Sequence, residues 1–484
     1  MRATFFGFES VRKALMASQK GLDVTIQNVS NVNTEGYTRQ RVDISSISPE
    51  SGATRYAKTK GEAVGGGVEV TGITQIRDQF LDLRFRKEAA EYGKWSASFS
   101  IMTDIENVLD EVSTNGLSAR LNDLYKELES FSINAESIEF ASIFRSSAQK
   151  VVEVLNQYSL SLADLQDQYL YNIRTDIDSA NRIIQDIAQL NSQIRGEVLQ
   201  GSPANELCDM RNLLIDRLSG YIGVGYEFDK DGQVSLKLGD TYLLDASKNN
   251  KIETIDLDAS GYPVKVVYKN GKVAQITAGS IGGSLSGLNG KGSFAMSDSD
   301  DKSIGIKYFQ MNIDSLARSI AESFNSINDP SGVNKLFDTL DGSPDINASN
   351  IKISDEWMRD ARFIKRSTTE SGEGSNDNLL RMITCLNEKR DITPNFKGTF
   401  EEFVVSLMGD VAVQTRYSKD MKDTSESILS TISDQRESIM GVSIDEESIN
   451  MERYQKSYNA AARIMTVLDE MLDMLINHMG IVGR

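Results

Sequence analysis

Histidine and cysteine, which often carry out catalysis or bind metals, are scarce in this chain. The 484 residues include one histidine, His478, and two cysteines, Cys208 and Cys385. His478 lies in a helical stripe near the C-terminus, where a cation is favourable, so we expect an ordinary helix residue and no general base or ligand. The cysteines are far apart and form no Cys-x-x-Cys pattern. We therefore expect buried or incidental thiols, and neither a disulfide framework nor a zinc site.

Acidic and glycine-rich stretches offer little more. Asp229 to Gly232 matches the start of a calcium loop, but Asp240 and its neighbours fit the end of such a loop only loosely, so a hairpin turn is expected. Asp298 to Asp301 is interleaved with serine and predicts a solvated loop. Gly65 to Gly67 lacks the Lys-Ser or Lys-Thr that follows in a phosphate-binding loop. We predict no catalytic, metal-binding or cofactor-binding residues and no enzymatic activity.

The charge balance argues against two classes of partner. There are 52 Lys and Arg residues against 70 Asp and Glu, a formal net charge of −18. A body this acidic repels nucleic-acid phosphates and anionic membranes. No apolar run approaches the ~18 residues of a membrane span, and we expect neither a membrane anchor nor a signal peptide. The length predicts several domains.

The strongest regular pattern is a 3,4 spacing of apolar residues near both ends of the chain. Near the C-terminus it runs from Ile444 to Met479, broken only at Glu447, and near the N-terminus from Phe8 to Val32 with two polar interruptions. Such a seam needs another helix to cover it, and we predict that the two ends pair as a coiled coil through which subunits polymerise. Periodicity alone leaves open two separate amphipathic helices docked on a globular body. The predicted interface consists of Phe8, Val11, Leu15, Leu22, Val29, Met451, Tyr454, Tyr458, Met465, Leu468, Leu472 and Leu475.

Two short groups of mostly polar residues adjoin these seams, one after the N-terminal helix and one at the start of the last helix. The first group ends the N-terminal helix in a turn, where Gly36 permits a positive φ. The second opens the last helix, where carboxylates favour the positive end of the helix dipole. The motif residues are Asn31, Asn33, Thr34, Gly36, Tyr37, Arg39 and Gln40, and Asp445, Glu446 and Glu447. Both stretches, the second continued from Tyr454 to Leu472, resemble the terminal signatures of the flagellar rod, hook and hook-associated family.

Within the chain, Leu190 to Ile194, Pro203 to Leu214 and Gly282 to Leu288 are similar to the hook-associated members at the junction between hook and filament. The resemblance implies an exported structural subunit that assembles at the hook tip. Implied partners are further copies of the chain in a ring, the hook protein, hook-associated protein 3, a cytoplasmic export chaperone and the flagellar export apparatus. The implied location is the flagellum, outside the cell or in the periplasm if the flagellum is internal.

The predicted fold is mainly α with a β-rich insertion. We assign residues 1–40 and 441–484 to a terminal coiled-coil polymerisation domain, and 41–220 and 301–440 to a mainly helical shaft with extended segments and loops. Apolar residues from Leu162 to Val198 follow a helical face within this shaft. Residues 221–300 contain short stretches in which apolar and polar residues alternate, as in strands, separated by hairpin signals that include an Asn270-Gly271 turn of type I′. We therefore expect a separate outer domain of strands.

Three alternatives stay open. The nearest is the hook protein itself or another rod or hook subunit, since these share the terminal signatures. An enzyme or a surface adhesin in the β-rich insertion belongs to a different class, although no residues there nominate a site. Truncation of the terminal seams distinguishes these classes, because it should abolish assembly and spare an activity located in the insertion.

Overall fold

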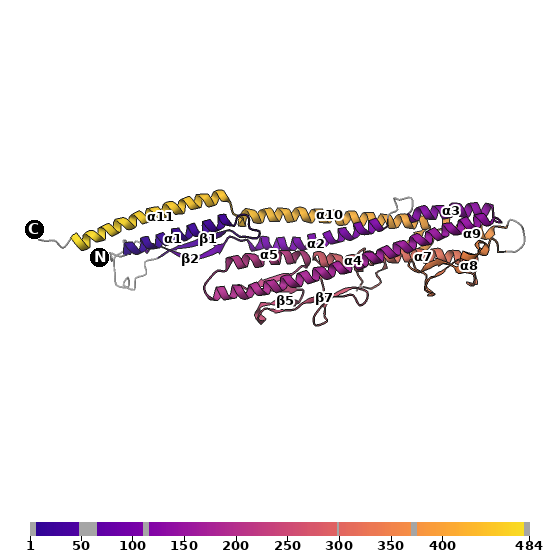
Figure 1. Ribbon diagram of the computed structural model, residues 1–484, viewed down its shortest axis with the longest axis horizontal. Coiled ribbons are helices and arrows are strands. Elements are labelled where there is room, and N and C mark those ends of the chain that lie inside the picture. The colour runs from indigo at the N-terminus through magenta and orange to yellow at the C-terminus, as the bar shows by residue number, and fades with distance from the viewer. Residues whose placement is uncertain (1–5, 48–64, 110–115, 298–299, 369–374, 479–484) are drawn as a thin grey trace, which may run out of the picture.

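In a computed structural model, described for residues 6–47, 65–109, 116–297, 300–368 and 375–478, the chain forms a long rod (Figure 1). Both ends of the described chain lie at the same end of the rod. The predicted fold class, mainly α with a β-rich insertion, is confirmed. None of the described helices is both long and apolar enough to cross a membrane.

One end of the rod, which we call the stem, contains two helices and a hairpin. The helices are α1 (Phe6–Ser30) and α11 (Ile444–Asp473), and the hairpin pairs β1 (Gln40–Ser46) with β2 (Val68–Gln75). The hairpin packs along α1, on the stem rather than in the shaft to which we assigned these residues. The stem therefore consists of two helices and a hairpin that packs against one of them.

The two stem helices run antiparallel in a regular register. An added Cβ on Gly7 would lie 3.8 Å from Leu468, and one on Gly21 would lie 2.6 Å from the Tyr454 ring. Asn28 donates a hydrogen bond to Glu447 at the far end of the pair. The three α1 positions are separated by multiples of seven residues, and so are their α11 partners, as in a coiled coil.

The rest of the rod, which we call the shaft, is built from long helices. Helix α2 (Gln79–Val108) pairs with α10 (Phe400–Met440). Helix α4 (Ile138–Leu199) has 62 residues, about 90 Å at ~1.5 Å per residue, and packs against α3 (Leu117–Ile133) and α5 (Asn205–Tyr221). The apolar face predicted from Leu162 is buried as far as Ile194, and Val198 is half-buried.

Two small antiparallel sheets lie along α4 in place of the separate outer domain expected at 221–300. The first contains β3 (Gly225–Phe228), β4 (Val234–Leu238), β5 (Thr241–Asp245) and β6 (Lys251–Ile252). The second contains β7 (Ile255–Asp258), β8 (Lys265–Tyr268) and β9 (Val273–Ala274). Their apolar residues belong to the same hydrophobic cluster as those of α4, because sheets this small cannot enclose a core alone.

The remaining part of 221–300 and one predicted turn also differ from expectation. Helix α6 (Gly279–Asn289) packs on α2 within the shaft. At the Asn270-Gly271 turn only Gly271 has a positive φ, +81°, and its N–H donates to the Tyr268 carbonyl. The turn is therefore type I followed by a left-handed glycine, and the type I′ prediction was wrong.

The far end of the shaft has an aromatic core. Trp357 of α8 (Asp355–Arg359) is fully buried, with ring centroids 5.8 Å from both Phe144 of α4 and Phe337 of β10 (Phe337–Thr339). The other elements there are α7 (Ile306–Asn328), α9 (Asp377–Asn387), β11 (Ile351–Ile353), β12 (Arg390–Thr393) and β13 (Phe396–Gly398). This core fixes the end opposite the stem.

Gly21→Ala should loosen the stem, because its methyl group would collide with the Tyr454 ring at 2.6 Å. We expect a loss of about 1–3 kcal/mol, typical of overpacking, measured as faster amide hydrogen exchange in α1 and α11. Gly196→Ala is the matched control, since that helical glycine has open space around it and alanine favours helix. Equal exchange in the two variants would contradict the close approach.

Candidate functional site at the joint between stem and shaft

The motif residues after α1 form the turn that carries the chain from stem to shaft. The Asn31 side chain donates to the Gln27 carbonyl at 2.9 Å and accepts from the Thr34 hydroxyl at 3.2 Å. Gly36 has φ +81°, and an added Cβ would lie 3.2 Å from Leu213 of α5. Three of the predicted motif residues thus shape the turn itself, and Asn33 is exposed beside them.

Asn28, a residue that we did not predict, is the centre of this turn. Its amide group, 1% exposed, donates to the Gln40 carbonyl at 2.9 Å and to Glu447 Oε2 at 3.2 Å. Its oxygen accepts from the Gln40 N–H at 3.0 Å and from the Tyr37 hydroxyl at 2.9 Å. All four hydrogen bonds of one buried amide therefore tie α1, the turn and α11 together.

Glu447 is the polar residue that interrupts the C-terminal seam. Its side chain is buried, and Oε1 lies 2.8 Å from Arg39 Nε and 2.7 Å from Arg39 Nη2. Arg39 also binds Glu446 at 2.7 Å, so one guanidinium holds two consecutive carboxylates of the first turn of α11. Ser443 caps this helix, and Asp445 stays exposed. The interruption in the seam is thus a paired, buried charge.

Hydrogen bonds continue from the turn into the shaft. The Thr38 N–H donates to Asp209 Oδ2 at 3.0 Å, and the Asn205 amide donates to Gln40 Oε1 at 3.2 Å. The Arg39 N–H donates to the Met440 carbonyl at the end of α10, at 2.9 Å. We call these contacts, with those of Asn28 and Glu447, the joint. Its shaft side is the segment 203–214 that resembles hook-associated members.

A network of ion pairs between arginine and aspartate side chains extends the joint along the shaft. Arg436 of α10 lies 3.0 Å from Asp82 of α2 and 2.8 Å from Asp216 of α5. Arg86 of α2 lies 2.6 Å from Asp216, and Arg77 pairs with Asp82. Because these groups are largely buried, each carboxylate depends on its guanidinium, and the network links three helices.

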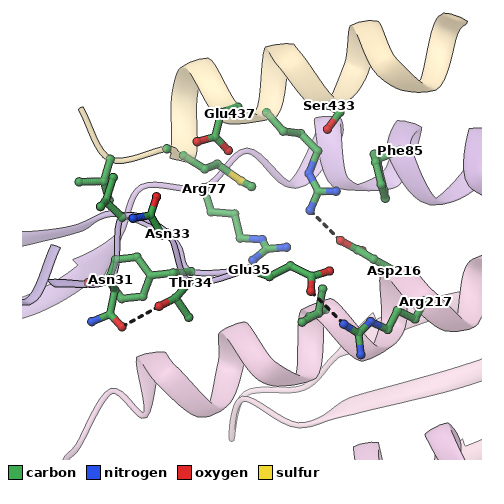
Figure 2. Close-up of a pocket in the computed structure, with 18 of the residues that line it drawn as sticks. Asn31, Asn33, Thr34, Glu35, Arg77, Phe85, Asp216, Arg217, Ser433 and Glu437 are labelled. Carbon is green, nitrogen blue, oxygen red and sulfur yellow. Dashed lines mark hydrogen bonds and ion pairs between the residues drawn. The ribbon is translucent and has the colours of Figure 1, made fainter. Parts of the chain in front are cut away.

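Beside the joint is a cleft of about 520 Å³. Figure 2 shows the turn with Asn31, Thr34 and Glu35 facing the end of α10 across it. Its lining residues include the ion pairs Arg217–Glu35 and Arg436–Asp216. Among the described residues, no cluster of three or more His, Cys, Asp or Glu side chains could hold a metal ion. The carboxylates of Asp216 and Glu35 are paired with arginines, so the chemistry of these walls is charge pairing.

Burial shifts the pKa of two groups in the joint. It raises the pKa of Asp209 to about 6, although Thr38 donates to this carboxylate and Arg77 lies 3.6 Å away. Burial, aided by the nearby carboxylates of Glu206, Asp209 and Glu447, also raises the pKa of the Tyr37 hydroxyl. Tyr37 therefore keeps the proton that it donates to Asn28.

The predicted seam residues lie along the stem, and two of them, Tyr454 and Leu468, approach Gly21 and Gly7 of α1. In the single chain Tyr458 is 38% and Leu475 44% exposed. The half-buried members are Phe8, Val11, Leu15, Leu22, Val29, Met451, Tyr454, Met465, Leu468 and Leu472. The buried residues of the stem include Ala461, which lies in the 3,4 pattern of the C-terminal seam, and two small residues that we did not predict, Ala17 and Gly21. Alanine and glycine at heptad spacing were the signal that could have identified them.

Asn28→Asp should destabilise the joint, because it replaces the amide that donates to Glu447 with a second carboxylate. We expect a loss of about 2–3 kcal/mol, and partial recovery when Glu447→Gln supplies a new donor, both measured by denaturant unfolding. Asn33→Asp in the exposed part of the turn is the matched control. Additive effects of the two joint substitutions would show that they do not interact.

The pH dependence of stability should identify Asp209. Its pKa in the folded chain, about 6, lies above the ordinary 3.8, so its contribution is greatest below 3.8 and is lost as the pH rises to about 6. Asp209→Asn cannot ionise, so its unfolding free energy relative to the wild type should rise over this interval and stay constant above it. Denaturant unfolding across the pH series measures the difference, and a change of opposite sign would mean that pairing with Arg77 dominates burial.

Two family models and one solved structure match parts of this chain. The model for the helical domain of flagellar hook-associated protein FlgK matches residues 102–335, and the model for the C-terminal part of the flagellar basal body rod proteins FlgEFG matches 435–478. The solved structure of the flagellar hook junction protein FlgK from Burkholderia pseudomallei is 19% identical, with a TM-score of 0.43, over 55% of this chain and 46% of that one.

Whole-chain relatives have one name in common. Flagellar hook-associated protein 1 of Bacillus subtilis is 30% identical over 516 residues, covering 100% of both chains. The protein of the same name in Escherichia coli is 23% identical over 548 residues, covering 96% of this chain and 98% of that one. The chain therefore belongs to the flagellar hook-associated protein 1 family and is a structural subunit of the bacterial flagellum that associates with other flagellar components.

Proposed function

We propose that this chain forms the junction between hook and filament, assembling as a ring at the hook tip. The observation that carries the proposal is the joint, in which both ends of the chain form one stem that is fixed to the shaft through Asn28, Arg39 and Glu447. A stem held in one direction lets every copy present the same surfaces to its neighbours. Whole-length similarity to proteins named hook-associated protein 1 supports the same role.

Assembly in this proposal depends on the terminal helices and the motif. The seam residues hold α1 and α11 together as one stem, and the motif residues set the orientation of that stem relative to the shaft. Contacts with neighbouring copies then stabilise this paired stem further. Polymerisation therefore requires both termini.

The proposed partners follow from this position in the flagellum. Copies of the chain contact one another, the hook protein below, and hook-associated protein 3 above. Before assembly the chain leaves the cell through the flagellar export apparatus, and a cytoplasmic chaperone covers the apolar C-terminal helix, whose exposed side chains invite premature association. The assembled protein lies outside the cell, or in the periplasm if the flagellum is internal.

The role we propose is structural and needs no catalysis or cofactor. The charged side chains of the joint form ion pairs that link α2, α5 and α10, which is a use of charge for positioning. An adhesin or an enzyme among strands β3 to β9 remains a weaker candidate of another class. Those strands contribute to the core of the shaft, which favours a supporting role for them.

A hook protein or another rod or hook subunit is the second candidate within the family. The match of residues 435–478 to the C-terminal model of rod proteins favours it, because it covers α11 and the end of α10. The match of 102–335 to the hook-associated helical domain favours the junction.

Deleting the gene should leave cells with hooks but without filaments, with unpolymerised filament protein released into the medium. The full chain should restore filaments, and a chain ending at Ile444 should not, because it lacks α11. Electron microscopy and motility assays measure both. Cells without hooks would favour the second candidate, and cells with intact filaments would refute an axial role.

A further inference from the structure

Helix α10 packs on α2 along a face that repeats every seven residues. The buried positions of this face are Val404, Val411, Ser418, Ser425 and Ile432. Seven-residue spacing is that of a coiled-coil seam, in which each position inserts between side chains of the facing helix. Apolar residues occupy both ends of this seam, and serines occupy two positions in its middle, which we call the serine layers.

Aromatic rings show which part of α2 faces the serine layers. Tyr417, next to Ser418, meets Trp95 of α2 with ring centroids 5.5 Å apart. Lys422, which lies between the two serines, has its ammonium group 5.6 Å from the centre of the Phe99 ring. The serine layers therefore lie at the level of Trp95 and Phe99.

At this level α2 packs closely against α6 and loosely against α10. Every residue from 91 to 100 is half-buried or exposed, although Ala90 before them and Ile101 after them are buried. On the α6 side, a Cβ added to Gly283 would lie 2.3 Å from the Lys94 carbonyl oxygen, so the two backbones are in contact. Helix α2 is therefore held by α6, and α10 is the partner that is free to move.

The seam also contains two hydroxyl groups that the described part of the chain leaves without hydrogen-bond partners. They belong to Ser418, which is fully buried, and to the neighbouring Thr415. Burying a hydroxyl without a partner is unfavourable, because the group loses its hydrogen bonds to water. Opening the seam restores those hydrogen bonds, which offsets part of the cost of losing the packing.

Both ends of the seam are held more firmly than its middle. Next to the joint, Arg436 pairs with Asp82 and Asp216. At the other end of α10, Phe403 and Leu407 are buried in the hydrophobic cluster of the shaft. Movement of α10 is therefore confined to the stretch between these two ends.

We propose that the serine layers form a compliant section of the shaft, at which α10 parts from α2 and closes again while both ends of the seam stay packed. A bundle bends more easily where one helix can move along its neighbour than where interdigitating side chains prevent that movement. The shaft can then bend at this level without disturbing the joint. This property goes beyond the proposed junction role and does not depend on it.

Amide hydrogen exchange of the purified full chain tests the section directly. A long helix ordinarily frays from its ends, so its middle exchanges most slowly. In α10 we expect the reverse, with residues 412–430 exchanging about tenfold faster than residues 403–411 and 432–440. Uniform protection along α10, or exchange that is fastest at its two ends, would overturn the proposal.

Removing the two buried hydroxyls tests the cause. The variant Ser418→Ala with Ser425→Ala should fold like the wild type and slow the exchange of residues 412–430 about tenfold, because the closed seam no longer contains an unpaired serine hydroxyl. The control Ser427→Ala with Ser430→Ala changes two exposed serines of the same helix and gains the same helix propensity. Unchanged exchange in the buried variant, or equal slowing in both variants, would contradict a role for the serine layers.

Discussion

The buried carboxylate of Glu447 is the group on which the rest of the stem depends. It is 2% exposed, and a carboxylate removed from water is strongly unfavourable unless charges and donors compensate it. Arg39 and Asn28 supply that compensation at 2.7 Å and 3.2 Å. Shifting α11 along α1 by one residue would remove both partners, so this interaction selects one register for the two helices.

A fixed register connects the ends of the chain to the whole rod. The same turn that binds Glu447 attaches to α5 through Asp209 and to the end of α10 through a main-chain hydrogen bond. The charge network around Arg436 then continues into α2.

Periodicity predicted much of this architecture and little of its polar detail. The 3,4 spacing identified α1, α11 and the buried face of α4, because apolar positions repeat within each helix. This spacing gave no sign of Gly21, whose lack of a side chain allows the Tyr454 ring to approach. For Glu447 we predicted only a favourable interaction with the helix dipole. The partner Arg39 lies 408 residues away in sequence, and Asn28 gave no local signal, so only the fold could bring these groups together.

A cryo-electron microscopy map of the assembled hook tip tests the central claim, that each copy enters the flagellum with its own ends paired and fixed at the joint. The account predicts α1 and α11 of one copy packed antiparallel, with Glu447 between Arg39 and Asn28 of the same chain. A map in which α1 separates from its own α11 and pairs instead along the Tyr454–Leu468 seam of a neighbour would contradict it.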